Sequence, residues 1–379
     1  MALSTNEAGT DPGLSALQPI TVYGSNISYF TGKIENYFRI KGVPYARRAM
    51  QLPRDGRLIR EKLGLFQMPV LQLGDGRWMT DSTKIIQWFE TQTRANPVVP
   101  SDPLQAFVCR LIEDYADEWL WRPAMHFRWY YPEGAILQSR HLADEHFGSL
   151  LLPGLLKRWY LRHRQRGGYT RGDGVTRDNV AGVEDIYFRT LQQLQAIFEK
   201  RPFMLGERPS LADVGMSGPF FRHFGLDPIP LEIMRERAPA VFEWVARLWN
   251  TRLAQCRGDW GTGIPDDFGS LLNEIGSSYL PYLCANVDAV ASGRKRFDVE
   301  VGGVRYRRAR YSRYRVWCLQ ELRAHFEALP ADAQTAARGL LEKHGCWEPL
   351  WRHPSLPLLP AQEQDLPFRG STKMIGVND

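Results

Sequence analysis

The sequence lacks a long apolar run and a recognisable export signal. Its longest apolar stretch, residues 150–156, is interrupted by Pro153 and Gly154, whereas a helix that spans a bilayer needs about 20 apolar residues. The first 18 residues have neither a basic start nor a continuous apolar core, so they do not resemble a secretory signal. We therefore expect a chain that does not cross a membrane and that begins with a disordered tail over residues 1–18.

Cysteine is scarce as well. The five cysteines among 379 residues are odd in number, widely spaced and never form a CxxC pair: Cys109, Cys256, Cys284, Cys318 and Cys346. This pattern favours neither a disulfide framework nor a zinc site. We expect a reducing, cytoplasmic environment and no metal.

The chain also has no strong charge bias. Its net charge is +6, from 48 basic and 42 acidic residues, and 44% of its residues are hydrophobic. This composition is typical of soluble globular proteins and excludes collagen-like, coiled-coil and disordered chains. The length predicts two or three domains, and the charge permits a nucleic-acid partner without requiring one.

What is present is an alternation of strand and helix patterns, followed by a long helical region. In the first part, strands are predicted near residues 19–23, 43–52, 69–73 and 77–79, and helices near 29–41, 58–63 and 82–92, in the order βαβαββα. A proline-rich linker at 96–103 then leads to helices predicted at 104–129 (with a kink at Pro123), 183–200, 212–223 and 240–253. Residues 163–179, rich in glycine and charge, predict an exposed loop.

The region from residue 257 to 379 has a different pattern. Gly302-Gly303 predicts the turn of a β-hairpin, with Glu300 opposite Arg305 and Asp298 opposite Arg307. Helices are predicted at 313–329 and 332–344, the second capped by Gly345.

Three segments of the first part carry chemistry. Ser28 lies where the first strand ends and the first helix begins. A hydroxyl there lies over unpaired N–H groups and the positive end of the helix dipole, which stabilise an anion such as a thiolate. The same position suits an ordinary N-cap, so Ser28 either caps the helix or activates a thiol.

The other two segments could hold the backbone and the ends of a small peptide. If the Met68-Pro69 bond is cis, Met68 can pair its N–H and C=O with an extended ligand. Asp81 and Ser82 begin the last helix of this part, where the N–H groups and the hydroxyl can bind a carboxylate and the Asp81 side chain can accept from an ammonium. Taken singly, each segment also suits a strand start or a helix cap.

Together, in this element order, the three segments resemble the glutathione-binding domain of the cytosolic glutathione transferase superfamily. The stretch Phe203-Met-Leu-Gly-Glu-Arg-Pro-Ser210-Leu-Ala-Asp213 is similar to the signature of that family's helical domain, in which Ser210 and Asp213 form a capping box. The resemblance covers residues 19–253. It implies an α+β protein with a thioredoxin-like domain at 19–95 and a helical domain at 96–256. An extension at 257–379, with the hairpin and helices, lies outside the family pattern.

The resemblance also implies a site. Ser28 matches the activating serine of the serine-using classes, and Tyr23 is a second candidate because tyrosine-using classes donate from nearly that position. The residues implied to bind glutathione are Gln67, Met68, Pro69, Asp81 and Ser82, with a cis bond before Pro69. Apolar and polar side chains of the long helix could form a wall for a second substrate: Trp119, Met125, His126 and Trp129.

We therefore expect a glutathione-dependent transferase that ionises glutathione for attack on a hydrophobic electrophile. The resemblance implies a homodimer through the first domain of one subunit and the long helix of the other. We expect no membrane partner, because no segment is long enough to span a bilayer. Isomerisation, bond cleavage or dehalogenation at the same site stay open, as does a non-catalytic binding module of this fold. Nucleic-acid binding through the arginines and tyrosines of residues 304–315 is the weaker alternative, because acids across the hairpin would neutralise part of that charge.

Overall fold

The computed structural model describes residues 12–52 and 54–357. Its first domain is built on a four-stranded sheet of order β2-β1-β3-β4, in which β1 and β2 are parallel and the other neighbours antiparallel. The strands are β1 (Thr21–Gly24), β2 (Ala46–Ala49), β3 (Val70–Gln72) and β4 (Trp78–Thr80). The helices are α2 (Tyr29–Lys41), α3 (Arg54–Leu63) and α4 (Ser82–Gln92). The predicted βαβαββα order and the thioredoxin-like architecture are confirmed.

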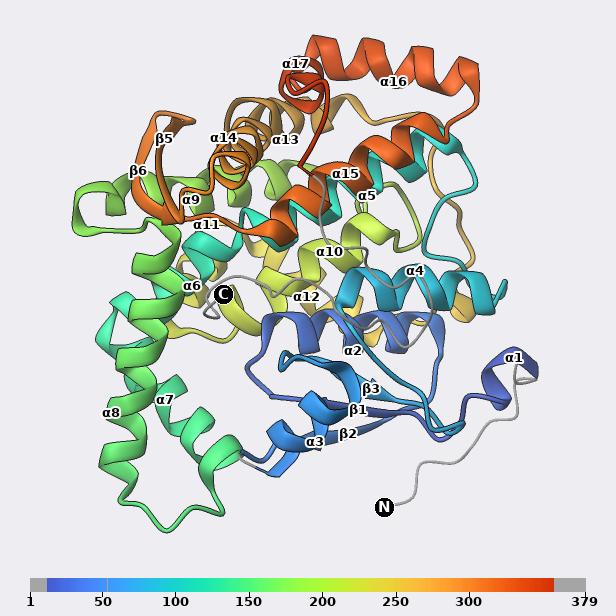
Figure 1. Cartoon of the computed structure of the whole chain (residues 1–379). Coiled ribbons are helices and arrows are strands. Elements are labelled where there is room, and N and C mark those ends of the chain that lie inside the picture. Colours follow the sequence, from blue (N-terminus) through green and yellow to red (C-terminus); the bar gives the residue numbers. More distant parts are fainter. Residues whose placement is uncertain (1–11, 53, 358–379) are drawn as a thin grey trace.

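The two faces of the sheet follow the alternation along its strands. Val22 and Leu71 pack in the main core with α2 and α4, whereas Tyr23 and Val70 point to the other face, which α3 covers. Figure 1 shows α2 and α4 between the sheet and the helical part of the molecule. The beginnings of α2 and α4 therefore lie where the first domain meets the rest of the chain.

The sequence prediction of a disordered tail at 1–18 requires a correction. Residues 1–11 lie outside the described residues, but a short helix, α1 (Pro12–Ser15), follows them. Leu14 and Leu17 are buried in the main core, and the carbonyl of Leu17 accepts from the N–H of Gly74 at 2.8 Å. The ordered first domain thus begins earlier than residue 19.

The long helix predicted at 104–129 is two helices. α5 (Pro103–Glu118) and α6 (Trp121–Tyr130) are separated at Trp119 and Leu120, so the break precedes Pro123 rather than occurring at it. Pro123 lies in the first turn of α6, where the missing N–H would have had no helical partner. Proline therefore marks the beginning of a helix here and not a kink.

The remaining helices of the second domain pack around α5 and α6. They are α7 (Pro132–Phe147), α8 (Gly154–Gln165), α9 (Val180–Phe198), α10 (Leu211–Pro219), α11 (Pro228–Arg237) and α12 (Pro239–Asn250). The capping box at the beginning of α10 is present as predicted. The Ser210 hydroxyl accepts from the backbone N–H of Asp213, and the Asp213 carboxylate accepts from the backbone N–H of Ser210. Asp213 also accepts from the N–H of Met204 and the indole of Trp244, both at 3.0 Å. This carboxylate fixes the helix start in the middle of the domain.

The prediction of an exposed loop at 163–179 is wrong. After α8 the chain forms a π-helical turn (Arg166–Thr170) and two short 3-10 turns (Arg171–Asp173 and Arg177–Asn179). Asp173 is buried and accepts from Arg315 at 2.8 Å and pairs with Arg122 at 3.3 Å. The partners that order this segment are 51 and 142 residues away along the chain, so its local composition gave no sign of them.

The extension forms a third layer on the helical domain (Figure 1). Its elements are α13 (Gly269–Glu274), α14 (Leu280–Ala291), β5 (Arg296–Val301), β6 (Val304–Arg310), α15 (Arg313–Glu327), α16 (Ala331–Lys343) and α17 (Trp347–Trp351). Gly302 and Gly303 form the hairpin turn with φ of 54° and 76°, and Glu300 faces Arg305 as predicted. The register then shifts at a bulge, so Asp298 does not face Arg307. It accepts instead from the N–H of Arg308 at 2.7 Å.

Helix α15 packs on α4 and α5, the face that the resemblance assigned to a partner subunit. Glu321 of α15 pairs with Lys84 of α4 at 2.9 Å, and Lys84 lies 4.8 Å from the ring centre of Trp317. Phe326 of α15 meets Phe107 of α5 with ring centres 5.9 Å apart. A homodimer through this face would require α15 to leave it, and the oligomeric state stays a prediction.

No helix within residues 12–52 and 54–357 combines the length and the apolar character needed to span a bilayer.

Candidate functional site

Ser28 is the N-cap of α2. Its backbone is extended (φ −79°, ψ 129°), and its hydroxyl oxygen accepts from the N–H of Thr31 at 3.3 Å. Among the described residues no acceptor is within hydrogen-bonding reach of the hydroxyl hydrogen. The half-buried hydroxyl can therefore donate to an anion while the end of α2 adds partial positive charge. Capping and activation are compatible roles for this one side chain.

The loop before Ser28 is held in place by side chains of three other elements. Arg128 of α6 donates to the carbonyl of Ile27 at 2.7 Å, and Arg222, in the π-helical turn that follows α10, donates to the carbonyl of Asn26. Glu145 of α7 accepts from the N–H of Asn26 at 3.1 Å. These contacts fix the backbone that presents Ser28.

The two arginines are themselves positioned by close packing and by acids. Arg128 is buried and donates to Asp227 at 2.8 Å; burial lowers its pKa, and Asp227 opposes that effect. Arg222 pairs with Glu35 at 2.5 Å and crosses α2 at Gly32, where an added Cβ would lie 2.3 Å from its Cγ. Sequence reasoning missed both arginines because they are about 100 and 200 residues from the loop they hold.

Tyr23 lies on the other face of the sheet. Its hydroxyl donates to Gln72 Oε1 at 2.9 Å and receives a longer contact from Arg48 at 3.4 Å. Its ring packs on Trp78 with centres 5.3 Å apart. The structure thus places Tyr23 in the cluster beneath α3, with its hydrogen already donated, and does not bring it together with Ser28.

Gln67, Met68 and Pro69 lie at the beginning of β3. The Met68-Pro69 bond is cis, and no backbone partner of Met68 occurs within the described part of the chain. Gln67 Nε2 donates to the hydroxyl of Thr80 at 2.9 Å, which in turn donates to the carbonyl of Pro69. The other amide atom, Gln67 Oε1, is buried and has no hydrogen-bond partner there.

Asp81 is the N-cap of α4 and has an unusual backbone, with φ of 75° and ψ of 114°. Such strained conformations cost about 1–3 kcal/mol and tend to occur at ligand sites. Its Oδ1 accepts from the N–H of Lys84 at 3.0 Å, whereas Oδ2 lacks a partner of standard geometry among the described residues. Gln67 and Asp81 are therefore joined through Thr80, and Gln67 Oε1 is a buried oxygen without a partner in the described chain.

The environment of Asp81 is nearly dry. Asp81 is 2% exposed and Ser82 4% exposed, and the Tyr314 hydroxyl of α15 lies beside the Asp81 carboxylate. Burial raises the pKa of Asp81 above its usual value, and the nearby N–H of Lys84 opposes this shift. The extension thus reaches the group predicted to receive an ammonium, a contact that the sequence did not reveal.

A cluster of buried charged side chains lies against the beginning of α4. Lys33 of α2 binds Glu113 at 2.6 Å and Asp117 at 2.5 Å, and the hydroxyl of Thr83 donates to Glu113 at 3.0 Å. Burial disfavours the charge of Lys33, but the two carboxylates outweigh it and raise its pKa above the usual value. The cluster joins α2, α4 and α5 at one point and so fixes the two helix ends relative to each other.

Two of the four side chains predicted for a second substrate lie next to the loop of Ser28. Met125 and Trp129 pack in one apolar cluster with Ile27, together with Leu142 of α7 and Leu161 of α8. Trp121, another aromatic side chain of the long predicted helix, borders the same cluster and stacks on Phe30 with ring centres 5.7 Å apart.

The other two predicted side chains lie elsewhere. Trp119 packs against Tyr282 and Tyr306 of the extension, with ring centres 5.5 and 5.8 Å apart. His126 bonds to Glu184 of α9 at 2.8 Å, and burial lowers its pKa. The structure therefore does not bring Trp119 or His126 together with Ser28.

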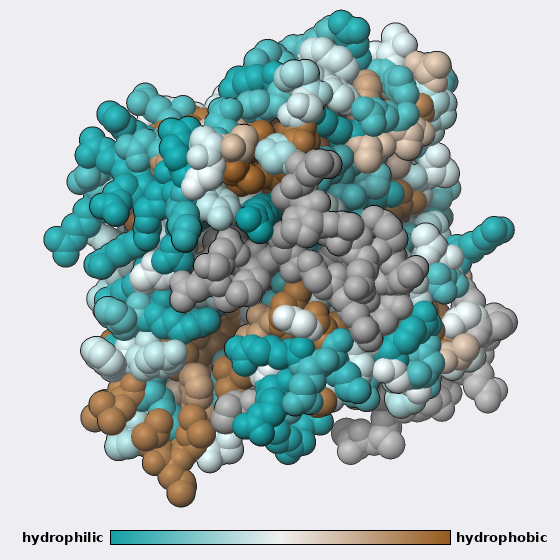
Figure 2. Space-filling model, in the orientation of Figure 1, coloured by the Kyte–Doolittle hydropathy of each residue, from teal (hydrophilic) through white to brown (hydrophobic). Residues whose placement is uncertain are grey.

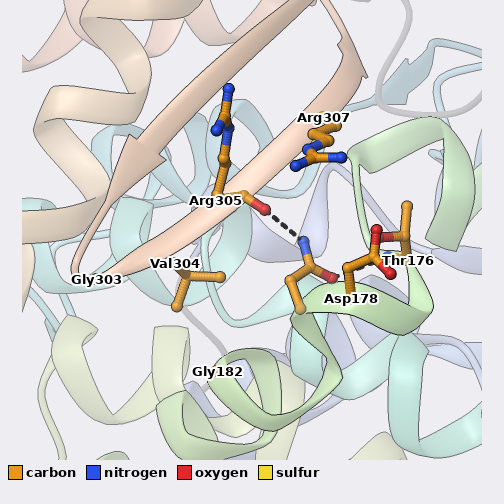
Figure 3. Close-up of a pocket in the computed structure, with 8 residues that line it drawn as sticks. Thr176, Asp178, Gly182, Gly303, Val304, Arg305 and Arg307 are labelled. Atoms are coloured by element: carbon orange, nitrogen blue, oxygen red, sulfur yellow. Dashed lines mark hydrogen bonds between the residues drawn. The ribbon is translucent and has the colours of Figure 1, made fainter.

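A separate pocket of about 270 Å³ opens between the hairpin and the beginning of α9 (Figure 3). Arg305 and Arg307 line it, but Asn179 uses its side chain to bind the carbonyl of Arg305 and the N–H of Thr176, both at 2.9 Å. None of the residues predicted to bind glutathione lines this pocket. Of the basic stripe at 304–315, Arg315 is buried on Glu118 and Asp173, which weakens the nucleic-acid alternative further.

Within the described residues, no group of three or more His, Cys, Asp or Glu side chains is arranged to hold a metal ion. The five cysteines are free thiols.

Comparison with known families finds one match in each of the first two domains. Residues 22–97 match the family model described as the glutathione S-transferase N-terminal domain, and residues 177–247 match that of the C-terminal domain. Glutathione S-transferase U2 of Arabidopsis thaliana is 28% identical over 102 residues, which are 27% of this chain and 45% of the relative. Glutathione S-transferase U7 of the same plant is 23% identical over 108 residues, 28% of this chain and 48% of the relative. The chain thus spans about half the length of these curated relatives.

Solved structures give likenesses to part of the chain. A glutathione S-transferase of Methylobacillus flagellatus with GSH bound covers 60% of this chain and 93% of its own, at 18% identity and a TM-score of 0.37. The beta-etherase LigF of Sphingobium sp. strain SYK-6 covers 60% and 94%, at 18% identity and a TM-score of 0.41.

Proposed function

We propose that this chain, which carries the N- and C-terminal domains of the glutathione S-transferase family, is a glutathione-dependent transferase. It binds glutathione on its first domain, stabilises the thiolate beside Ser28 and directs it at an apolar electrophile held next to Ile27. Isomerisation, bond cleavage and dehalogenation share the same first step and lie within this proposal.

The groups at the beginning of α4 suit the γ-glutamyl end of glutathione. Its ammonium would donate to the Asp81 carboxylate and to Gln67 Oε1, and its α-carboxylate would accept from the first N–H groups of α4 and the hydroxyl of Ser82. The free N–H and C=O of Met68 would pair with the peptide backbone of the ligand.

The observation that carries this proposal is a pair of buried oxygens: Gln67 Oε1, which has no hydrogen-bond partner in the described chain, and Asp81 Oδ2, whose carboxylate has the Tyr314 hydroxyl beside it. A buried acceptor without a donor costs about 1–3 kcal/mol, so an ammonium that donates to Gln67 Oε1 and to the ionised Asp81 carboxylate would be stabilised.

Ser28 supplies the activation step. Its oxygen accepts from the N–H of Thr31, so its hydrogen remains for the sulfur anion. The hydroxyl donor and the helix end each contribute about 1–3 kcal/mol in a partly dry site, which corresponds to a fall of about one or two units in the thiol pKa. Met125 and Trp129 would provide the apolar wall for the electrophile.

A second candidate is a non-catalytic binding module of the same fold. The position of Tyr314 favours it, because this side chain of the extension lies where an incoming ammonium would approach Asp81. In that case α15 would take the place of the ligand's γ-glutamyl end.

Calorimetry with reduced glutathione separates the two. We expect the wild-type chain to bind, and Asp81→Asn to bind at least about tenfold more weakly, or about 1.4 kcal/mol, because a charge-assisted hydrogen bond is lost. Burial raises the pKa of Asp81, and the ammonium needs the ionised carboxylate, so wild-type affinity should fall as the pH is lowered through that raised pKa.

Asp75→Asn, in the turn between β3 and β4, is the matched control and should leave affinity unchanged. Tyr314→Phe should bind glutathione as tightly as wild type or more tightly. No binding by the wild-type chain, with binding appearing only in Tyr314→Phe, would support the non-catalytic candidate.

A further inference from the structure

An exposed apolar patch lies where α7 turns into α8. Six large apolar side chains there are exposed to solvent, and we call this set the α7–α8 tip: Leu151, Leu152, Leu155, Leu156, Trp159 and Tyr160. Figure 2 shows a protruding hydrophobic patch at the lower left, where Figure 1 places the turn between these helices. Elsewhere in the described chain only Tyr130, Ile136 and Phe242 are comparably exposed. Soluble proteins rarely expose such a contiguous patch unless it binds something.

The geometry of α8 separates an inner side from an outer one. Leu155, Leu156, Trp159 and Tyr160 recur at spacings of one and four residues, so they share one face of the helix. Leu161 is the buried residue of α8 and packs in the cluster with Ile27. The outer apolar stripe is covered by no described part of the chain.

The charge along α8 has one sign. Between Glu145 and Asp173 the sequence contains no acidic residue and six basic ones: Lys157, Arg158, Arg162, Arg164, Arg166 and Arg171. Around the helix, Arg162 falls next to Leu155, seven residues before it, and Arg164 falls next to Tyr160, four residues before it. The apolar stripe is therefore bordered by arginine on both sides.

We propose that the α7–α8 tip is a docking surface for an anionic lipid bilayer. An amphipathic helix with leucine and tryptophan on one side and lysine and arginine beside them is the pattern that lies in the plane of a membrane interface. The leucines enter the acyl boundary, Trp159 and Tyr160 lie at the headgroup level, and the arginines bind the anionic headgroups.

The charge pattern argues against a second copy of the chain as the occupant. Two tips packed face to face would bring the arginines that border each stripe, Arg162 and Arg164, against those of the other copy, and like charges oppose such contact. The sequence predicts no membrane partner because no segment is long enough to span a bilayer. Docking at the surface needs no spanning helix, so the two observations are compatible.

The tip also adjoins the candidate site through α8. The outer face of α8 would rest on lipid, while Leu161, on the inner face of α8, contacts the cluster of Ile27, Met125 and Trp129. This step rests on the proposed function: the substrates that reach the site from the membrane would be apolar electrophiles dissolved in the bilayer. Vesicle binding itself does not depend on that function.

Co-sedimentation of the full chain with vesicles tests the proposal. We expect binding to vesicles of phosphatidylcholine mixed with phosphatidylserine and at least about tenfold weaker binding to phosphatidylcholine alone, with a marked loss at high salt. Leu155→Ser/Trp159→Ser should abolish binding, and Arg162→Gln/Arg164→Gln should weaken it about tenfold or more on the anionic vesicles.

Matched controls lie outside the tip. Phe242→Ser removes an exposed apolar side chain on α12, and Arg177→Gln/Arg257→Gln removes two exposed charges; both should bind like wild type, and glutathione affinity should be the same in all variants. No binding of the wild-type chain to anionic vesicles, or equal binding by the Leu155→Ser/Trp159→Ser variant, overturns the proposal. A doubled mass in solution that this variant returns to a single chain would overturn it in favour of self-association.

Discussion

The hydroxyl of Ser28 differs from that of Tyr23 in what happens to its hydrogen. Tyr23 already donates to Gln72 at 2.9 Å, whereas Ser28 accepts from Thr31 and keeps its hydrogen free within the described structure. Ser28→Ala should therefore leave glutathione affinity nearly intact, raise the pKa of the bound thiol by about one or two units and slow turnover by about 10²-fold or more. Thiolate absorbance against pH measures the shift.

Tyr23→Phe is the comparison variant for this experiment. Because its hydroxyl lies in the cluster beneath α3, we expect its thiolate titration to match that of the wild-type chain. A serine variant with a normal titration, alongside a tyrosine variant that has lost it, would show that the assignment of the hydroxyl is reversed.

At the residue scale, sequence could predict what is set by local structure. A serine or an aspartate at the beginning of a helix is an N-cap by its own chemistry, so Ser28 and Asp81 were found from their neighbours alone. Arg128, Arg222 and Tyr314 could not be found in this way, because each acts on a residue about 100 or more positions distant.

At the element scale, the contact between α5 and the extension contains a carboxyl group, that of Asp114, whose protonated form is favoured by burial. Asp114 of α5 accepts from the hydroxyl of Tyr279 at 2.6 Å and lies beside Cys318 of α15. Burial raises the pKa of Asp114 from 3.8 to about 7, and the hydroxyl of Tyr279 opposes the shift, while Glu118 and Glu113 on the same helix add to it. The packing of α15 on α5 is therefore coupled to pH.

The direction in which stability changes with pH follows from the number of protons bound by the native and the unfolded chain. Between the two pKa values the native chain holds a proton that the unfolded chain has released, so stability falls as the pH rises from about 4 to about 7. Each pH unit in this range costs about 1.4 kcal/mol for this one group. Asp114→Asn should weaken the fall of the melting temperature across this range and should melt above the wild-type chain at about pH 8.

Differential scanning fluorimetry of both chains over this pH range gives the comparison. Asp144→Asn, an exposed acid on α7, is the control and should follow the wild-type profile. Parallel profiles for Asp114→Asn and the wild-type chain would mean that Asp114 is ionised in the native state at neutral pH.

Element boundaries were predictable where local signals set them. Gly42 at φ 84° ends α2 where predicted, and the Gly302-Gly303 turn was found from its sequence. The break between α5 and α6 and the ordered turns of 166–179 were not, because tertiary contacts such as the pairing of Asp173 with Arg122 and Arg315 decide them. Local composition indicated only that the second segment is irregular.

At the scale of the whole molecule, the resemblance described the first two layers well and gave nothing for the third. The extension follows no family pattern, so its position could not be predicted from the sequence. Buried ion pairs hold it to the helical domain: Arg315 of α15 contacts Glu118 at 3.1 Å and Asp173 at 2.8 Å. Removing one member would leave buried charge unpaired at a cost of about 3–5 kcal/mol, so the layer is an integral part of the fold.

That third layer decides the assembly we expect. α15 covers α4 and α5 through the pair of Lys84 and Glu321 and the packing of Phe326 on Phe107. A second subunit on this face would have to displace α15, which the buried ion pairs of Arg315 hold to the helical domain. Light scattering at micromolar concentration should therefore give the mass of one chain, 43.5 kDa. A double-mutant cycle of Lys84→Ala and Glu321→Ala tests the contact itself: this partly exposed pair should couple by about 0.2–1 kcal/mol in the monomer. Twice the mass together with no coupling would show that α15 leaves the face and that a partner subunit takes its place.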